Sequence, residues 1–156
     1  MRTRIVVLAV ATVLCGALAG AAWYDTDRAD RRTAAGNEAL NAATAATAAL
    51  FSYDYRSFDA SVANGKQFAT GPFAQEYAET TASLRESVRK EQAVVRAEVS
   101  AAGVVTAAPD RVEILLYVNQ YRRNLNITGE KVDQNRVVLT LVPVDGTWKV
   151  VAATAI

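Results

Sequence analysis

The chain of 156 residues has no histidine, a single cysteine and three prolines, and each scarcity excludes a kind of chemistry. Without histidine, neither a Ser-His-Asp triad nor a histidine-ligated metal centre can form. Cys15 lies inside an apolar stretch, so we expect no intrachain disulfide and no cysteine nucleophile. Asp, Glu, Lys and Tyr remain for proton transfer. The composition therefore predicts a protein that is not an enzyme and that binds no metal and no cofactor.

The charge balance also excludes a class of partner. Lys and Arg number 17 and Asp and Glu number 16, and no run of like charge forms a basic stripe. Nucleic-acid binding requires such a stripe, so we expect none. The length beyond the N-terminal apolar stretch suits one globular domain.

The N-terminal stretch at residues 5–23 contains no charged residue and is followed by Tyr24. As a helix it would be about 28 Å long, close to the ~30 Å hydrocarbon core of a bilayer. Trp23 and Tyr24 are typical of the membrane interface. We therefore expect residues 1–24 to be a transmembrane anchor. The residues expected to contact the membrane are Ile5, Leu8, Leu14, Leu18, Trp23 and Tyr24.

Two alternatives to a retained anchor are a cleaved signal peptide and a lipoprotein. Small-residue cleavage sites exist at residues 17–19 and 19–21, but the apolar segment continues past them. Acylation of Cys15 would follow Leu14 rather than a small residue, which disfavours the lipoprotein. Acidic residues follow the stretch closely, at Asp25, Asp27 and Asp30. We therefore expect a single-pass protein of the cytoplasmic membrane, with a cytoplasmic N-terminus and an extracytoplasmic C-terminal domain.

Residues 25–50 form an alanine-rich segment without proline, which predicts a helix. Its small-residue face is either part of a spacer or a close-packing surface for another helix. The residues on that face are Ala39, Ala42, Ala43, Ala46, Ala49 and Leu50.

The next segment is the richest in aromatic residues. Phe51, Tyr55 and Phe58 are spaced as one face of a helix, which indicates core packing. Tyr53 and Asp54 fall off that face. A tyrosine beside a carboxylate could transfer a proton, but structural hydrogen bonding is the favoured interpretation.

The remaining pattern predicts one further helix and four strands. Asn64-Gly65 and Thr70-Gly71-Pro72 interrupt the chain, and the helix is expected over residues 72–90. Alternation predicts strands over residues 95–101, 111–123, 136–144 and 148–153, with a hairpin at Asp145-Gly146. The strand at 111–123 is expected to be buried on both sides at its centre. The predicted fold class is α+β, with helices packed on a curved four-stranded antiparallel sheet over residues 51–156 and a cone-shaped interior.

Several segments together carry a family resemblance: LFSYDYRSFDASV, TGPFAQEY, GVVTAAPDRVEILLYVNQ and RVVLTLVPVDGTWKV. With the anchor and the alanine-rich helix before them, they resemble the Mce-associated membrane proteins of actinobacteria. The motif residues are Ser52, Tyr53, Asp54, Tyr55 and Asp59. The resemblance implies a cone-like fold of the nuclear transport factor 2 type, similar to the inner-membrane assembly proteins of type IV secretion systems.

The resemblance implies an accessory subunit that stabilises an Mce-type lipid transport complex through protein contacts outside the cytoplasmic membrane. The expected partners are therefore the membrane and Mce complex proteins. One alternative is a lipid- or sterol-binding module that holds an apolar ligand in the cone. The expected pocket lining is Phe51, Tyr55, Phe58, Tyr117 and Trp148. Another alternative is an assembly component of a type IV conjugation or secretion channel.

Overall fold

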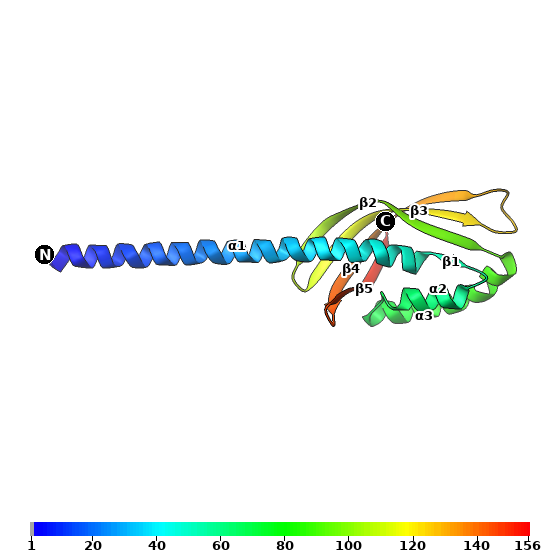
Figure 1. The fold of residues 1–156 in the computed structure, drawn as a ribbon, viewed down its shortest axis with the longest axis horizontal. Coiled ribbons are helices and arrows are strands. Elements are labelled where there is room, and N and C mark those ends of the chain that lie inside the picture. The colour runs from blue at the N-terminus through cyan, green and yellow to red at the C-terminus, as the bar shows by residue number, and fades with distance from the viewer. Residues whose placement is uncertain (1) are drawn as a thin grey trace.

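A computed structural model describes the backbone of residues 2–156 and the side chains of residues 26–156 (Figure 1). The fold is α+β, with three helices followed by most of the sheet. In chain order the elements are α1 (Arg2–Phe51), β1 (Tyr53–Asp54), α2 (Phe58–Lys66), α3 (Gly71–Glu91), β2 (Val94–Ala108), β3 (Arg111–Arg123), β4 (Lys131–Val144) and β5 (Thr147–Ala155).

The strands form a single antiparallel sheet in the order β1-β2-β3-β4-β5. At its centre Ile114 pairs with Val104 on one side and Leu139 on the other. The hairpin between β4 and β5 turns through Asp145 and Gly146, whose φ values of 50° and 75° suit a type I′ turn. This hairpin confirms the prediction made from the Asp-Gly pair.

The sheet has five strands rather than the predicted four, because the short β1 adds an edge strand. Tyr53 and Asp54 pair with Val95 and Val94 of β2. The helical face predicted for Phe51, Tyr55 and Phe58 is therefore wrong: α1 ends before β1 and α2 begins after it.

A local turn explains the break between α1 and α2. The Asp54 carboxylate accepts a hydrogen bond from the Arg56 backbone N–H at 2.9 Å. The Asp54 carbonyl accepts another from the Ser57 N–H at 3.0 Å. Side-chain bonds of this kind offer the backbone an alternative to the helix. The break predicted at Asn64-Gly65 is also absent, since both residues lie within α2.

The helix α1 crosses one face of the sheet and contacts β2, β3, β4 and β5 (Figure 1). Its buried residues are small and recur every three or four positions, so the backbone approaches the strands closely. The small-residue face was correctly predicted, but its main neighbour is the sheet and not another helix. The buried residues of α1 are Ala35, Ala39, Ala43, Ala46, Thr47, Ala49 and Leu50.

The core lies between the helices and one face of the sheet. In β3, Val112, Ile114, Leu116 and Val118 alternate along the strand and are at most 3% exposed. On the opposite face Tyr117 is 45% exposed. The expected burial of β3 on both sides is therefore wrong, because the described helices cover only one face.

The expected membrane anchor lies outside the described side chains, so Ile5, Leu8, Leu14, Leu18, Trp23 and Tyr24 remain a prediction. Over residues 26–156, no helix has both the length and the hydropathy that crossing a bilayer requires. The division of the chain at residues 24 and 50 likewise stays a prediction.

Candidate functional site

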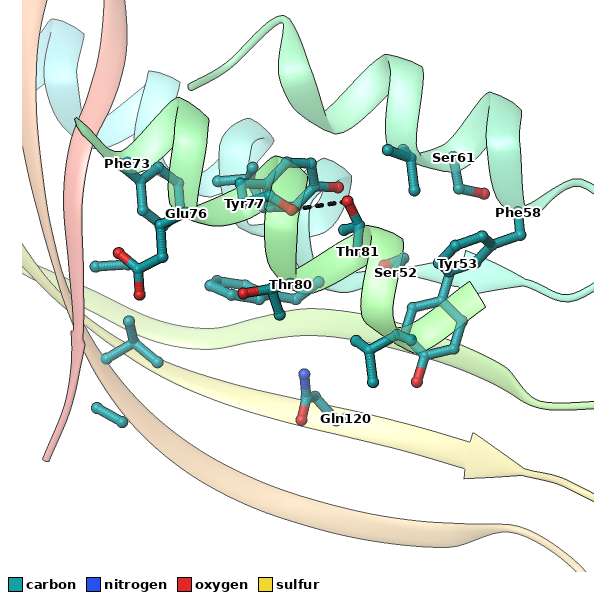
Figure 2. Close-up of a pocket in the computed structure, with 17 residues that line it drawn as sticks. Ser52, Tyr53, Phe58, Ser61, Phe73, Glu76, Tyr77, Thr80, Thr81 and Gln120 are labelled. Atoms are coloured by element: carbon teal, nitrogen blue, oxygen red, sulfur yellow. Dashed lines mark hydrogen bonds between the residues drawn. The ribbon is translucent and has the colours of Figure 1, made fainter. Parts of the chain in front are cut away.

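A pocket of about 380 Å³ lies between the end of α1, the pair α2 and α3, and the sheet (Figure 2). Most of its surface is apolar, and the exposed side chains of Glu76, Thr80 and Leu84 lie at its mouth. Its apolar lining residues are Leu50, Phe51, Phe58, Val62, Phe73, Leu84, Val137, Ala153 and Ala155. Its remaining lining residues are Ser52, Tyr53, Ser61, Glu76, Tyr77, Thr80, Thr81 and Gln120.

Of the five residues expected to line a pocket, the structure brings together Phe51 and Phe58. Tyr55 lies outside, with the Arg56 guanidinium 5.5 Å from its ring centre. Tyr117 is exposed on the uncovered face of the sheet. Trp148 is engaged with α1, where its indole Nε1 donates a hydrogen bond to Glu38 Oε2 at 3.2 Å. Trp148 contacts α1 at Glu38, whereas the pocket lies farther along, at Leu50 and Phe51 where α1 ends.

The most important lining residues that the sequence reasoning did not assign to a pocket lie on α3. Phe73, Tyr77, Thr80 and Leu84 follow the spacing of one helical face. Phe73 and Tyr77 are buried, whereas Thr80 and Leu84, farther along the same face, are exposed. In the sequence this face begins with two aromatic residues and continues with a polar and an aliphatic residue. The sequence predicts this helix but does not show what lies opposite this face, and only the position of α2 shows that a pocket forms.

The aromatic walls are held in place by specific contacts. Tyr53 and Phe58 pack edge to face, with ring centres 5.6 Å apart and planes at 81°. Phe73 and Tyr77 are 6.2 Å apart on α3. The Thr81 hydroxyl donates to the Tyr77 carbonyl at 2.7 Å. The aromatic residues of the pocket therefore pack against one another in two pairs.

Eight of the lining residues carry a polar side chain, and all of these except Glu76 are of neutral residue types. Burial raises the pKa of Tyr53, an effect partly opposed by Arg122, and burial also raises the pKa of Tyr77. Both hydroxyls are therefore protonated at neutral pH. Of the described residues that line the pocket, none is Lys or Arg and only Glu76 is a carboxylic acid. The described lining residues thus include no cation that could pair with an anionic ligand.

The motif residues that follow α1 form structural contacts. Ser52 Oγ accepts a hydrogen bond from the Ala97 N–H at 2.9 Å, which ties the end of α1 to β2. Asp54 pairs with Arg56 at 2.8 Å. The hydrogen bond from the Arg56 side chain, with that from its backbone, lowers the pKa of Asp54. Tyr53 and Asp54 also form β1, so their side chains point to opposite faces of the sheet.

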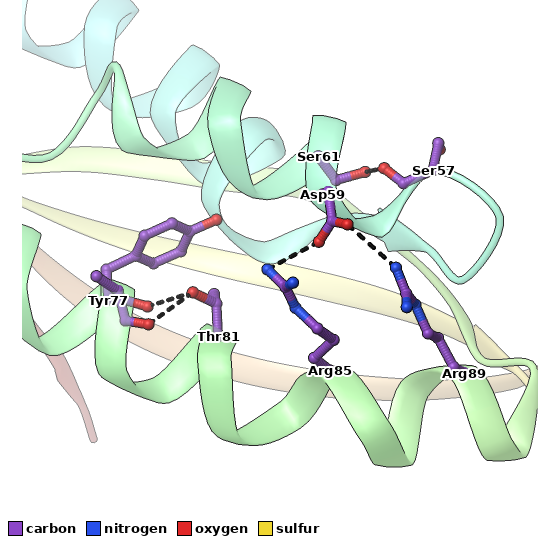
Figure 3. Close-up of polar contacts among 8 residues, drawn as sticks. Ser57, Asp59, Ser61, Tyr77, Thr81, Arg85 and Arg89 are labelled. Atoms are coloured by element: carbon purple, nitrogen blue, oxygen red, sulfur yellow. Dashed lines mark hydrogen bonds and ion pairs between the residues drawn. The ribbon is translucent and has the colours of Figure 1, made fainter.

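Asp59 joins α2 to α3 through two arginines (Figure 3). Its carboxylate oxygens lie 2.9 Å from Arg85 and 3.1 Å from Arg89. All three side chains are about half exposed, so each ion pair contributes little stability by itself. The arrangement orients α2 on α3 beside the pocket. In the described part of the chain, no three His, Cys, Asp or Glu side chains gather to hold a metal.

Comparison with solved structures shows which class of fold this is. The chain matches an IcmL-like type IV secretion system protein from Legionella pneumophila with a TM-score of 0.62, 18% identity, and coverage of 75% of this chain and 88% of that one. It matches the periplasmic domain of DotI with a TM-score of 0.63, 12% identity, and coverage of 74% and 91%. It matches CagV, a VirB8 homologue from Helicobacter pylori, with a TM-score of 0.60, 12% identity, and coverage of 74% and 94%. The chain therefore shares its fold with these three solved proteins, one of which is named as a VirB8 homologue and one as a periplasmic domain.

Relatives in sequence come from Mycobacterium tuberculosis. Two proteins, named Uncharacterized protein Rv1362c (strain H37Rv) and Uncharacterized protein MT1407 (strain CDC 1551), are each 26% identical over 154 residues. The match covers 97% of this chain and 70% of each relative. No protein-family model matches the chain. The resemblance to Mce-associated proteins is therefore not confirmed by these comparisons and stays a prediction.

Proposed function

We propose that this chain is a non-enzymatic assembly or accessory subunit of a transport complex in the cell envelope. In this proposal residues 5–23 anchor it in the cytoplasmic membrane, and the α+β domain acts outside that membrane through contacts with other proteins. The supporting observation is the fold, shared with three solved proteins of which two are named as type IV secretion components and one as a periplasmic domain.

The fold likeness favours a type IV secretion-like assembly role over an Mce-type role. Each of the three solved chains is covered over 88% or more of its length, so the whole domain is shared and not one motif. Support for an Mce complex rests on the sequence segments alone. Both roles require the same placement beside a membrane complex, and they differ in the partner.

Affinity purification of the full chain from native membranes in mild detergent tests the proposal. We expect components of one transport system to co-purify, and their identity decides between a secretion or conjugation channel and an Mce complex. Recovery of the chain alone, with the levels of both systems unchanged when its gene is deleted, would overturn the proposal.

The anchor has a separate test, because the accessory role depends on it. Sequencing of the mature N-terminus is expected to find residues 5–23 retained, and alkaline extraction is expected to leave the chain in the membrane fraction. Protease added outside the cytoplasmic membrane should degrade the C-terminal domain. A mature start at Gly20 or Ala22 would instead show a cleaved signal peptide.

A further inference from the structure

The pocket beside α3 has the size and lining of a small-molecule site. Its volume of about 380 Å³ falls within the usual range of ligand pockets, roughly 300–1,000 Å³. Its apolar lining residues include Leu50 and Phe51 on α1, Phe58 on α2, Phe73 on α3 and Val137 on β4. An apolar chain placed there would bury its surface against side chains that already exclude water from the core.

The helix packing keeps this space open. Gly65 of α2 admits the Tyr77 hydroxyl so closely that a Cβ at position 65 would lie 2.7 Å from Tyr77 Cζ. Figure 3 shows the Tyr77 ring directed from α3 toward α2. The ring therefore forms a wall of the pocket instead of filling it. Phe58 is held in turn by its edge-to-face contact with Tyr53.

Gln120 and Thr80 are polar lining residues with unused hydrogen-bonding capacity. Gln120 Oε1 accepts a hydrogen bond from Asn135 Nδ2 at 3.0 Å, which leaves the Gln120 amide nitrogen as a donor. Figure 2 shows that nitrogen pointing from β3 toward Thr80 of α3. In the part of the chain that the structure describes, neither the Gln120 amide nitrogen nor the Thr80 hydroxyl has a protein partner. A hydroxyl or carbonyl oxygen of a ligand could accept from both.

The charge of the pocket selects against an anionic head group. A carboxylate or phosphate there would find no Lys or Arg among the lining residues and would share the pocket with Glu76, while Arg122, whose charge acts on Tyr53, is not a lining residue. An unpaired or like-charged anion is disfavoured in a partly buried site. An uncharged head group meets neither penalty.

From these observations we propose that the pocket binds one uncharged, single-chain amphiphile, such as a long-chain alcohol. Its apolar chain lies between the aromatic residues, and its oxygen accepts hydrogen bonds from Gln120 and Thr80. This proposal stands independently of the assembly role.

Photo-crosslinking of the full chain in lipid nanodiscs tests the proposal directly. The probes are dodecanol and dodecanoate that carry the same photoreactive diazirine in the chain, and the crosslinked peptides are mapped by mass spectrometry. We expect dodecanol to label the segments at residues 51–62 and 73–84 about tenfold more than dodecanoate does, the equivalent of 1.4 kcal/mol. Equal labelling by the two probes would overturn the selectivity for a neutral head group. Labelling confined to residues 1–25 would overturn the site.

A pair of neighbouring substitutions on β5 tests the location. Ala155 and Thr154 are both exposed, but Ala155 lines the pocket, whereas Thr154, as the adjacent strand residue, faces the other side of the sheet. Ala155→Phe should reduce dodecanol labelling about tenfold, and Thr154→Phe should leave it within about twofold. Circular dichroism is used to check that both variants are folded. Equal labelling in the two folded variants would show that the ligand lies elsewhere.

A second pair of substitutions on α3 tests the role of charge. Glu76 lines the pocket, whereas Glu79 lies outside it and accepts a hydrogen bond from Gln75 at 3.0 Å. Glu76→Lys should raise dodecanoate labelling about tenfold, and Glu79→Lys should not. If both variants raise it equally, general surface charge explains the effect and the proposal fails.

Discussion

The Tyr77 hydroxyl of α3 occupies the position that a side chain at Gly65 of α2 would need. An ideal Cβ on Gly65 would overlap that hydroxyl and lie 2.7 Å from Tyr77 Cζ and 3.1 Å from the Ala49 carbonyl oxygen of α1. Three helices therefore meet at one residue without a side chain. Gly65 was interpreted from the sequence as a chain break, but it lies inside α2 and permits this close packing.

Gly65→Ala is expected to lower the free energy of unfolding by about 1–3 kcal/mol, because α2 or α3 must move to admit the methyl group. Gly36→Ala in α1 is the matched control. A Cβ there would make ordinary contacts of 3.6 Å with Ala107 and Val104. The control should stabilise the protein by up to about 1 kcal/mol through helix propensity. Urea unfolding measures both, and equal effects would contradict the packing argument.

The Trp148 indole and Glu38 join β5 to α1, and their coupling can be measured. Trp148→Phe and Glu38→Gln should each destabilise the protein modestly, since they remove or weaken the hydrogen bond of 3.2 Å. A double-mutant cycle is expected to give a coupling energy of about 0.5–1.5 kcal/mol. A coupling near zero would show that the bond contributes nothing to docking of α1 on the sheet.

Asp54 should make stability dependent on acidic pH. Hydrogen bonds from the Arg56 side chain and backbone lower the pKa of Asp54 in the folded state. The stabilisation is therefore fully present above the unfolded pKa of about 3.9 and is lost as pH falls through the lowered folded pKa. The Asp54→Asn variant should have a lower free energy of unfolding than the native chain at pH about 7. This difference should disappear once the pH is below the folded pKa of Asp54.

Carboxyl titration by NMR measures the cause of this dependence. Arg56→Gln removes the side-chain hydrogen bond, so the pKa of Asp54 should return toward its ordinary value while the backbone contact still opposes a full return. An unchanged pKa in that variant would show that Arg56 is not the origin of the shift.

Tyr77 should make the protein less stable as the pH rises in the alkaline range, whereas Asp54 does so as the pH falls. Burial raises its pKa in the folded state. Its stabilisation is therefore present below the unfolded pKa of about 10 and is lost as pH rises through the raised folded pKa. Tyr77→Phe should weaken the loss of stability above pH about 10. Near-ultraviolet absorbance during an alkaline titration should show one fewer late-titrating tyrosine, and an unaltered late phase would contradict the assignment.

Local patterns predicted the elements whose partners are adjacent in the sequence. The alternation of Val112, Ile114, Leu116 and Val118 predicted β3 with the observed bounds, and Asp145-Gly146 predicted the last hairpin. The strand β1 could not be predicted in this way, because Tyr53 and Asp54 pair with residues about forty positions away. Helical spacing of the nearby aromatics indicated the wrong period.

The sequence predicts the lining of the pocket only in part. The large aromatic residues predict a lining of five residues, of which Phe51 and Phe58 line the pocket in the structure. Size alone does not say which face of an element a residue occupies or whether it is already engaged. Tyr117 faces away from the helices, and Trp148 bonds to a residue 110 positions earlier. These facts depend on the docking of α1 across the sheet, which no local pattern encodes.

Because α1 is a continuous helix, its residue count fixes how far the pocket is rotated about the helix axis relative to the N-terminal end of α1. Residues 26–34 are exposed or half exposed, and burial on the sheet begins at Ala35. One residue inserted there would turn everything downstream by about 100° about the helix axis and shift it by 1.5 Å, without altering a packed contact. A four-residue insertion would turn it by only about 40°. The direction in which the pocket faces is thus set by a residue count.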